Sequence, residues 1–152
     1  MKIMDFLCNE ATLFELKPGD KQSILTEMVG ALVKLGKVKK SDEVVDALLQ
    51  REKLGSTGIG QGVAIPHCRC DAVKEHIAML GISHPGIDFA TLDGKPVNLV
   101  FLLLCPADAN GQHLQIMARV SRLFKDRSFR QSLLEAKSSA DVAAIINKAD
   151  AQ

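Results

Sequence analysis

Apolar residues recur every three to four positions in five segments of the chain, a spacing that predicts amphipathic helices. Asp20 is a good N-cap for the first helix, and Gly36 ends it in the way that glycine commonly ends helices. Ser41 and Ser139 are the expected N-caps of the second and the last helix. The predicted helices cover 20–36, 41–54, 113–124, 127–136 and a segment from 139 onward.

Short apolar runs between these helices predict strands. Val97–Cys105 is apolar almost throughout, which is typical of a central strand covered on both faces. Ile77–Ile82 is a second strand, and Thr12–Leu16 is a weaker candidate for a first one. Val63–Ile65 looks like a buried strand that Pro66 ends. Strands interleaved with helices indicate an α/β sandwich.

The Asp93-Gly94 pair is a strong turn signal just before the long apolar run. It predicts a mixed parallel and antiparallel sheet flanked by helices, not a purely parallel one. The chain has 152 residues, 47% of them apolar, which is enough for one domain with a proper core. We therefore expect a single domain over 1–152, with its core at about 10–148.

Composition and charge exclude several classes of protein. The formal net charge is +1, so bulk electrostatics favours neither nucleic acid nor an anionic membrane. No apolar run approaches the roughly 18–20 residues that a transmembrane helix needs, and the N-terminus resembles neither a signal peptide nor a transit peptide. We expect no membrane insertion and a cytoplasmic location. A chain of this length needs no disulfide scaffold, so the cysteines are expected to be reduced: Cys8, Cys68, Cys70 and Cys105.

The segment from Gly55 to His67 carries the most functional information. Glycines at 55, 58, 60 and 62 are followed by a short apolar run, Pro66 and His67. Glycine allows positive φ and a close approach of the backbone to a ligand or partner. The apolar run and the proline are expected to deliver His67 to the surface from a rigid stem.

This arrangement favours chemistry on the imidazole. A lone histidine is more often structural than catalytic, but the glycine-rich lead-in favours a functional role for His67. A neutral imidazole, with a reference pKa of about 6.5, can act as a nucleophile near pH 7 and form a covalent intermediate. Phosphoryl transfer also needs positive or hydrogen-bonding groups, which an arginine or the N–H groups of a glycine-rich loop can supply.

The segment resembles the active-site signature of the enzyme IIA components of the phosphoenolpyruvate-dependent phosphotransferase system, mannitol/fructose type. Within that family, the nitrogen-regulatory branch (the stand-alone PtsN or IIA-Ntr proteins) is most similar to the string Arg51-Glu52-Lys53-Leu54-Gly55-Ser56-Thr57-Gly58-Ile59-Gly60. The resemblance runs from about Leu13 to the last helix, and it implies the fold of the mannitol-type IIA domains.

The resemblance implies a phosphohistidine carrier. His67 is then the phosphorylated residue, on its tele nitrogen, Arg51 helps to hold the phosphoryl group, and His113 sits beside His67 in support. By spacing alone, Arg51 also fits a solvated helix-end charge and His113 a solvated residue at a helix N-terminus. Glu52 is expected to hold the loop by a salt bridge or a helix-end hydrogen bond. The candidates for further phosphoryl contacts, or equally for loop stabilisation, are Ser56, Thr57, Gly58, Gly60 and Gly62.

Members of this family take the phosphoryl group from an HPr-like carrier, itself phosphorylated by an enzyme I. The resemblance implies a nitrogen or metabolic regulatory protein that acts on target proteins through its phosphorylation state. It implies no cofactor and no small-molecule turnover by the protein on its own. A stand-alone IIA subunit of a fructose/mannitol-type sugar transport system is the alternative within the family.

Cys68 stands where family members often have a glycine after the active histidine, and its side chain could narrow the approach of a partner. With His67 and Cys70 it forms a cluster of soft or borderline metal ligands within four residues. A metal- or redox-responsive protein that uses these three residues is the alternative from another class. Structural zinc sites prefer a C-x₂₋₄-C spacing and a second ligand pair, which is not obvious here, so we expect no metal.

Two further interpretations are weaker. The glycines at 58, 60 and 62 superficially resemble a dinucleotide fingerprint, but they follow a helix and lead into a strand, the reverse of the required context. Tyr and Trp are absent, so a basic stretch indicates a solvated face or a contact for an acidic partner, and no nucleic-acid binding. The residues of this basic stretch are Arg119, Arg122, Lys125, Arg127 and Arg130.

Two other histidines, His76 and His84, match no functional pattern. They are expected to be structural or exposed.

Overall fold

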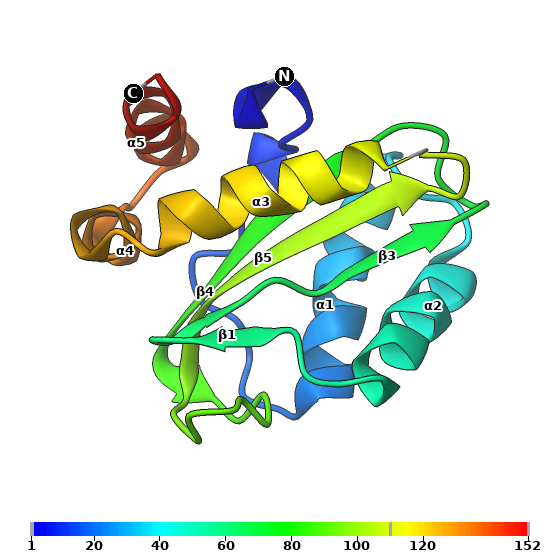
Figure 1. Cartoon of the computed structure of the whole chain (residues 1–152), viewed down its shortest axis with the longest axis horizontal. Coiled ribbons are helices and arrows are strands. Elements are labelled where there is room, and N and C mark those ends of the chain that lie inside the picture. Colours follow the sequence, from blue (N-terminus) through cyan, green and yellow to red (C-terminus); the bar gives the residue numbers. More distant parts are fainter. Residues whose placement is uncertain (1, 110, 152) are drawn as a thin grey trace.

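Strand β5 (Val97–Pro106) runs through the middle of a five-stranded sheet in the computed structural model, which describes residues 2–109 and 111–151 (Figure 1). On one side β5 pairs in parallel with β2 (Val63–Ala64) and then with β3 (His67–Cys70). On the other side it pairs antiparallel with β4 (Ile77–Ile87), and β1 (Gly58–Gly60) is antiparallel to β2. The prediction of a mixed sheet is confirmed.

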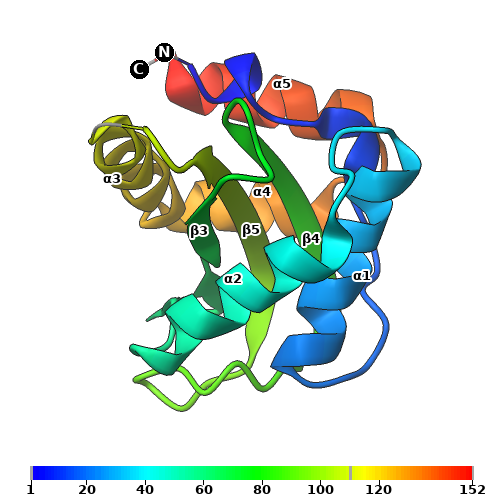
Figure 2. The same ribbon diagram turned by 90° about the vertical axis from the view of Figure 1, so that its right-hand side faces the viewer.

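Helices cover both faces of this sheet (Figures 1 and 2). Two of them, α1 (Lys21–Lys34) and α2 (Ser41–Lys53), lie on one face. The other face carries α3 (Gln112–Phe124), α4 (Arg127–Glu135) and α5 (Ser139–Asp150). Two short 3₁₀ helices, η1 (Ile3–Asp5) and η2 (Asn9–Ala11), precede them. This is the α/β sandwich that the sequence predicts. None of the helices in the described part of the chain is long and apolar enough to cross a membrane.

The nearly unbroken apolar run of β5 follows from its place between two layers of helices. Phe101 and Leu103 pack into the core formed with α3, α4 and α5, whereas Leu102 and Leu104 pack into the core formed with α1 and α2. Successive side chains of a strand point to opposite faces, so a central strand covered on both sides is apolar at every position. Each such buried side chain stabilises the fold by roughly 1.5–3 kcal/mol.

Helix α1 begins and ends as predicted. The Asp20 side chain caps its first turn by accepting a hydrogen bond from the Ser23 backbone N–H at 2.8 Å. At the other end Gly36 has a φ of 72°, and the Lys37 N–H donates to the Leu32 carbonyl at 3.0 Å. This bond belongs to the Schellman motif, which needs a left-handed residue and therefore favours glycine at this position.

Two predicted N-caps are wrong by one residue. Ser41 and Ser139 are each the first residue of their helix, and Lys40 and Ser138 hold the cap positions. The Ser138 side chain accepts a hydrogen bond from the Asp141 N–H at 3.1 Å, so a serine still caps α5. Lys40 makes no side-chain cap, and two acidic residues in the first turn of α2 favour the positive end of the helix dipole instead.

The segment Thr12–Leu16 does not form the regular strand that its pattern suggested. Leu13 makes an isolated bridge to Gly81 of β4, and the 3₁₀ helix η2 immediately precedes this segment. The Thr12 hydroxyl stabilises that turn by donating to the Asn9 carbonyl at 2.7 Å. The segment still pairs with β4 at single points, since the Leu13 N–H donates to the Leu80 carbonyl at 3.0 Å and the Leu16 N–H donates to the Ile82 carbonyl at 2.7 Å, but these bonds do not extend into a regular ladder.

Pro66 follows the short strand β2 and interrupts the pairing, as predicted. The sequence pattern does not predict that a further strand, β3, begins at the next residue. Proline has no N–H to donate, so the ladder is interrupted there. The Pro66 carbonyl still accepts from the Leu103 N–H at 2.9 Å, which keeps the chain beside β5. His67 therefore stands on a strand of the sheet, and its rigid support is β5 as well as the preceding proline.

The N-terminal segment and the end of α5 lie side by side (Figure 2). The Ile3 N–H donates to the Asp150 carboxylate at 2.7 Å, and Arg119 of α3 forms an ion pair with the same carboxylate. Arg119, one of the basic stretch, is thus engaged within the fold and is not a solvated charge.

Candidate functional site

His67 is the first residue of β3 and lies half-buried on the face of the sheet that α3 covers. Its neighbour Cys68 packs into the core beneath α1 and α2, so the alternation of the strand turns the imidazole to the opposite face. Pairing with Leu103 of β5 fixes the backbone at this position. The sheet thereby gives the imidazole a defined place, which a reacting group needs.

One hydrogen bond fixes the orientation and the tautomer of this imidazole. His67 Nδ1 lies 2.8 Å from the backbone carbonyl oxygen of Ile65. A carbonyl oxygen can only accept, so Nδ1 carries the proton in the neutral ring. The lone pair of the neutral imidazole is then on Nε2, which is the nitrogen that can act as a nucleophile.

The surroundings of His67 also favour its neutral form. Burial lowers the pKa of the imidazole below its usual 6.5, and the charges of Arg51 and His113 lower it further. The Ile65 carbonyl and the Glu52 carboxylate oppose this shift in the pKa because they stabilise the protonated ring. Since the net direction is down, the ring is neutral near pH 7 and its Nε2 lone pair is available.

Arg51 lies in the last turn of α2, immediately before the glycine-rich segment, as the sequence predicts. Its Nη1 donates to the Gly55 carbonyl at 2.9 Å, which ties the guanidinium to the loop. Among the described residues this is the only hydrogen-bond partner of the side chain, so its other N–H donors remain for a ligand. The positive charge of this guanidinium lowers the pKa of the His67 imidazole.

His113 lies in the first turn of α3, which follows Gly111, a glycine with a φ of 84°. Its charge also lowers the pKa of His67. Its Nδ1 is buried and has no hydrogen-bond partner within residues 2–109 and 111–151.

His76, which matches no functional pattern in the sequence, immediately precedes β4. Burial lowers the pKa of His76, and His113 lowers it further. Its Nε2 is buried without a partner in the described part of the chain, like the Nδ1 of His113. No spacing signal points to this pair, because positions 76 and 113 lie far apart in the sequence.

The loop between α2 and β1 uses its own polar groups to hold its shape. The Ser56 hydroxyl donates to the Phe89 carbonyl at 2.9 Å and accepts from the Gly58 N–H at 3.1 Å. The hydroxyl and the N–H of Thr57 both donate to the Glu52 carboxylate. These candidates for phosphoryl contacts are therefore engaged inside the protein, and Glu52 holds the loop as expected.

The glycines of the motif shape a hairpin. Gly60 and Gly62 have φ values of 87° and 80° in the tight turn between β1 and β2, a conformation that favours glycine. A Cβ on Gly58 would lie only 2.3 Å from the Thr91 Cγ2, so this strand can lie against the β4–β5 connection only without a side chain. The glycine-rich motif thus encodes the hairpin that leads to His67.

Cys68 and the imidazole lie on opposite faces of the sheet. Cys68 is buried between the sheet and α1–α2, so it does not narrow the approach to His67. Burial raises the pKa of its thiol to about 12, with smaller contributions from Cys70 and Cys105, so the thiol stays protonated at neutral pH. In the described ranges, no group of three His, Cys, Asp or Glu side chains is arranged to hold a metal ion. The geometry therefore does not favour joint ligation by His67, Cys68 and Cys70.

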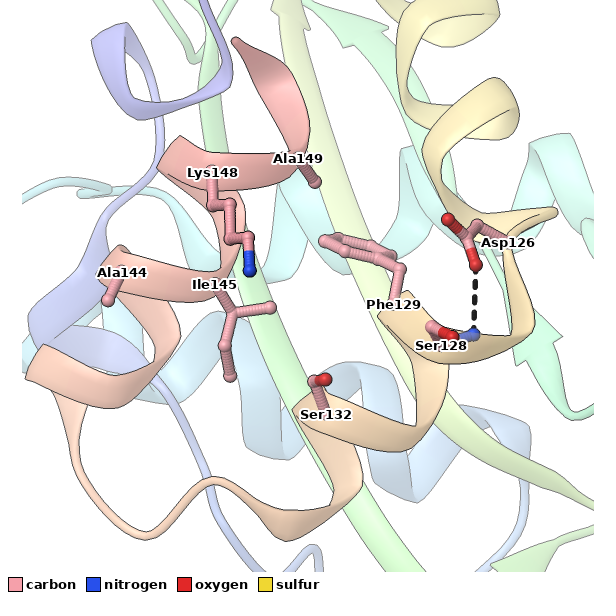
Figure 3. Close-up of a pocket in the computed structure, with 8 residues that line it drawn as sticks. All are labelled: Asp126, Ser128, Phe129, Ser132, Ala144, Ile145, Lys148 and Ala149. Carbon is pink, nitrogen blue, oxygen red and sulfur yellow. Dashed lines mark hydrogen bonds between the residues drawn. The ribbon is translucent and has the colours of Figure 1, made fainter. Parts of the chain in front are cut away.

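A separate hollow of about 410 Å³ lies between α4 and α5 (Figure 3). Phe129 and Ile145 point toward it from the two helices, and Lys148 extends over it. The Asp126 carboxylate at its edge accepts from the Ser128 N–H at 2.9 Å and so caps α4. None of the predicted site residues lines this hollow, so the candidate site is the region around His67.

Nearly the whole chain matches a known protein family. Residues 5–149 match the family model described as phosphoenolpyruvate-dependent sugar phosphotransferase system, EIIA 2. A nitrogen regulatory protein of Bradyrhizobium diazoefficiens is 39% identical over 146 residues, which cover 95% of this chain and 92% of that protein. The fructose-specific EIIABC component of Bacillus subtilis is 37% identical over 150 residues, 99% of this chain, but the chain spans only 24% of that protein.

Solved structures agree with these matches. The crystal structure of nitrogen regulatory protein IIA-Ntr from Neisseria meningitidis has a TM-score of 0.87 at 35% identity, covering 95% of this chain and 98% of that one. The structure of IIA mannitol from Escherichia coli has a TM-score of 0.76 at 24% identity, covering 90% of this chain and 96% of that one, and shares the fold.

Proposed function

The chain belongs to the EIIA type 2 family of the phosphoenolpyruvate-dependent sugar phosphotransferase system, and from this premise we propose that it carries a phosphoryl group on His67. The observation that supports this most directly is the hydrogen bond from Nδ1 to the Ile65 carbonyl, because it leaves Nε2 unprotonated. The lowered pKa of the ring supports the same conclusion, since only a neutral imidazole can attack phosphorus.

The proposed transfer exchanges one phosphorus–nitrogen bond for another. The Nε2 lone pair of His67 attacks the phosphorus of a phosphohistidine on the donor protein, the donor's P–N bond breaks, and its electron pair returns to the donor imidazole. The proton on Nδ1 stays in its hydrogen bond to the Ile65 carbonyl throughout. The product is tele-phosphohistidine, and the balance needs no cofactor.

Arg51 and His113 support the phosphoryl group in this proposal from the ends of two helices. The guanidinium of Arg51 can bind two phosphoryl oxygens with its planar fork, while its bond to Gly55 keeps it beside the loop. His113 stands in the first turn of α3, where the positive end of the helix dipole also favours an anion. Positive groups of this kind stabilise the charge on the transferring phosphoryl group.

The proposed donor is an HPr-like carrier protein, and two exposed apolar side chains beside the site fit a protein partner. Leu54 follows the turn that holds Arg51 and is 84% exposed, and Leu114 follows His113 and is 65% exposed. An apolar patch around a reactive group is typical of a protein-docking face. Leu114→Glu should therefore raise the KM for the carrier with little change in kcat. Leu35→Glu, at the exposed end of α1, is the matched control.

A regulatory role is favoured by the string Arg51–Gly60 and by the nitrogen regulatory relative, which matches over nearly its whole length. Phosphorylation adds about −1.5 to −2 charges to the face around His67. A target that docks on the neutral face loses affinity on phosphorylation, and one that presents arginines gains it. Only such a differential affinity can make the phosphorylation state a signal. The alternative, a stand-alone IIA subunit of fructose/mannitol-type transport, is supported by the fructose-specific relative and requires passage of the group to a IIB component.

Incubation with enzyme I, an HPr-type carrier and phosphoenolpyruvate, followed by intact-mass measurement, tests the carrier role. One acid-labile phosphoryl group is expected on the wild type and none on His67→Ala. His113→Ala and Arg51→Lys should still be phosphorylated, about 10²-fold more slowly. A folded wild-type protein that no matched carrier phosphorylates would refute the proposal. Transfer of the phosphoryl group onward to an added IIB component would indicate a role in transport. Binding to a target protein that differs between the two phosphorylation states would indicate a regulatory role.

A further inference from the structure

Glu52 is a buried carboxylate that the proposed transfer step does not use. It lies at the end of α2, next to Arg51 in sequence, and is 8% exposed. A buried charge needs an ion partner and hydrogen-bond donors. Lys21 Nζ lies 2.8 Å from Glu52 Oε1, the Thr57 N–H donates to the same oxygen at 3.1 Å, and the Thr57 hydroxyl donates to Oε2. Both carboxylate oxygens are therefore held.

Lys21 stands in an unfavourable place for a lysine. It is the first residue of α1, at the positive end of the helix dipole. Its ammonium compensates for that cost by its ion pair with Glu52 and by its position 4.9 Å from the centroid of the Phe89 ring. Lys21 therefore supplies the ion partner that a buried carboxylate at Glu52 needs.

A continuous hydrogen-bonded path leads from the Glu52 carboxylate to His67. Glu52 accepts both donors of Thr57, and the Thr57 carbonyl accepts from the Ile65 N–H at 3.0 Å. The Ile65 carbonyl in turn accepts from Nδ1 of His67 at 2.8 Å. Each bond in this path holds the residue that makes the next bond.

We propose that Glu52 is a positioning residue for phosphoryl transfer, acting on His67 through Thr57 and Ile65. The held carboxylate keeps the Ile65 carbonyl where it receives the Nδ1 proton, so Nε2 is the free nitrogen and keeps its direction. The functional consequence rests on the proposed carrier function, whereas the positioning itself involves no partner. The charge of Glu52 also acts on the imidazole directly, since it raises the pKa of His67 against the effect of Arg51.

Nitrogen-15 NMR of His67 tests the positioning in the isolated protein. Thr57→Val removes the hydroxyl and should produce a measurable population of the Nε2–H tautomer, whereas Thr57→Ser keeps the hydroxyl and should match the wild type. Glu52→Gln should change the tautomer and also lower the pKa of His67, because loss of a nearby negative charge destabilises the protonated ring. Glu43→Gln removes an exposed carboxylate from the first turn of the same helix and is the control for charge.

The rate of phosphorylation by the carrier is the functional readout. Glu52→Gln and Thr57→Val should accept the phosphoryl group about tenfold more slowly with nearly unchanged KM, because misorientation affects the chemical step and not docking. A folded Glu52→Gln protein with wild-type tautomer, pKa and rate overturns the proposal, as do equal effects of Thr57→Val and Thr57→Ser. If Glu52→Gln does not fold, the two Thr57 variants decide. A tautomer change in a protein that no carrier phosphorylates refutes the proposed function and supports the positioning role.

Discussion

Replacement of Asp150 by alanine should destabilise the fold by about 2–4 kcal/mol while leaving the chemistry at His67 intact. Asp150 lies at the end of α5 and is 4% exposed. Its carboxylate accepts from the buried Ile3 N–H at 2.7 Å and pairs with Arg119 of α3. One side chain thus joins the N-terminal segment, α3 and α5.

The magnitude follows from what each partner retains after the truncation. Ile3 is buried, so its N–H loses its acceptor without gaining water, at a cost of about 1–3 kcal/mol. The Arg119 side chain is 30% exposed and can turn toward water, so its lost ion pair costs only about 1 kcal/mol. The sum is about 2–4 kcal/mol, which corresponds to a decrease in Tm of roughly 4–16 °C for a chain of this size.

Urea and thermal denaturation followed by circular dichroism measure this loss. Asp150→Asn keeps an acceptor for the Ile3 N–H and should lose about half as much stability as Asp150→Ala. Asp108→Asn, at an exposed carboxylate after β5, is the control and should change stability by less than about 0.5 kcal/mol. A comparably small loss in Asp150→Ala would refute the argument from the buried donor. Equal losses in the two Asp150 variants would show that charge, and not the acceptor, is what matters.

Three further predictions concern other parts of the fold. His84 Nδ1 lies 2.6 Å from the Glu15 carboxylate, which raises the pKa of His84, and its Nε2 lies 2.9 Å from the Leu134 carbonyl. A raised folded-state pKa stabilises the protein fully below the unfolded value of about 6.5, and this stabilisation is lost as pH rises through the folded value. The urea midpoint of the wild type, measured relative to that of His84→Gln, should therefore decrease as pH rises above about 6.5. Gly58→Ala should lower the Tm because its Cβ would lie 2.3 Å from the Thr91 Cγ2, and Thr91→Ser, which lacks that methyl group, should restore part of the loss. Labelling with a thiol reagent at pH 8, mapped by mass spectrometry, should reach half-buried Cys70 well before Cys68, since burial raises the pKa of the Cys68 thiol to about 12.

Most of the fold could be predicted because its signals are local or strongly periodic. The unbroken apolar run of β5 indicates a strand covered on both faces, and Asp20 and Gly36 mark the ends of α1 through caps made within a few residues. Strand β3 could not be predicted in the same way. Its sequence, His67-Cys68-Arg69-Cys70, has no large apolar residue, and its pairing is supplied by β5, more than thirty residues further along the chain.

The site shows the same division between local and distant signals. His67 could be singled out from its glycine-rich lead-in, whereas Arg51 and His113 follow from the resemblance to the family. The charges of both residues lower the pKa of His67. The roles of the loop residues could not be chosen, because a serine or threonine beside a glycine can bind a ligand or its own backbone equally well. In the folded structure Ser56 bonds to Phe89, in the β4–β5 connection, and Thr57 bonds to Glu52.

Arg51 and Glu52 are consecutive residues of opposite charge, and they move the pKa of His67 in opposite directions. Neighbouring residues of an α-helix point roughly 100° apart. At the end of α2, Arg51 can therefore bond to the loop beside the site while Glu52 reaches into the core. In the proposed carrier this opposition has a use. Arg51 favours arrival of a phosphoryl group, whereas a fixed carboxylate limits how tightly the group is held. A carrier needs both effects, because a phosphoryl group bound too favourably would not pass to the next protein.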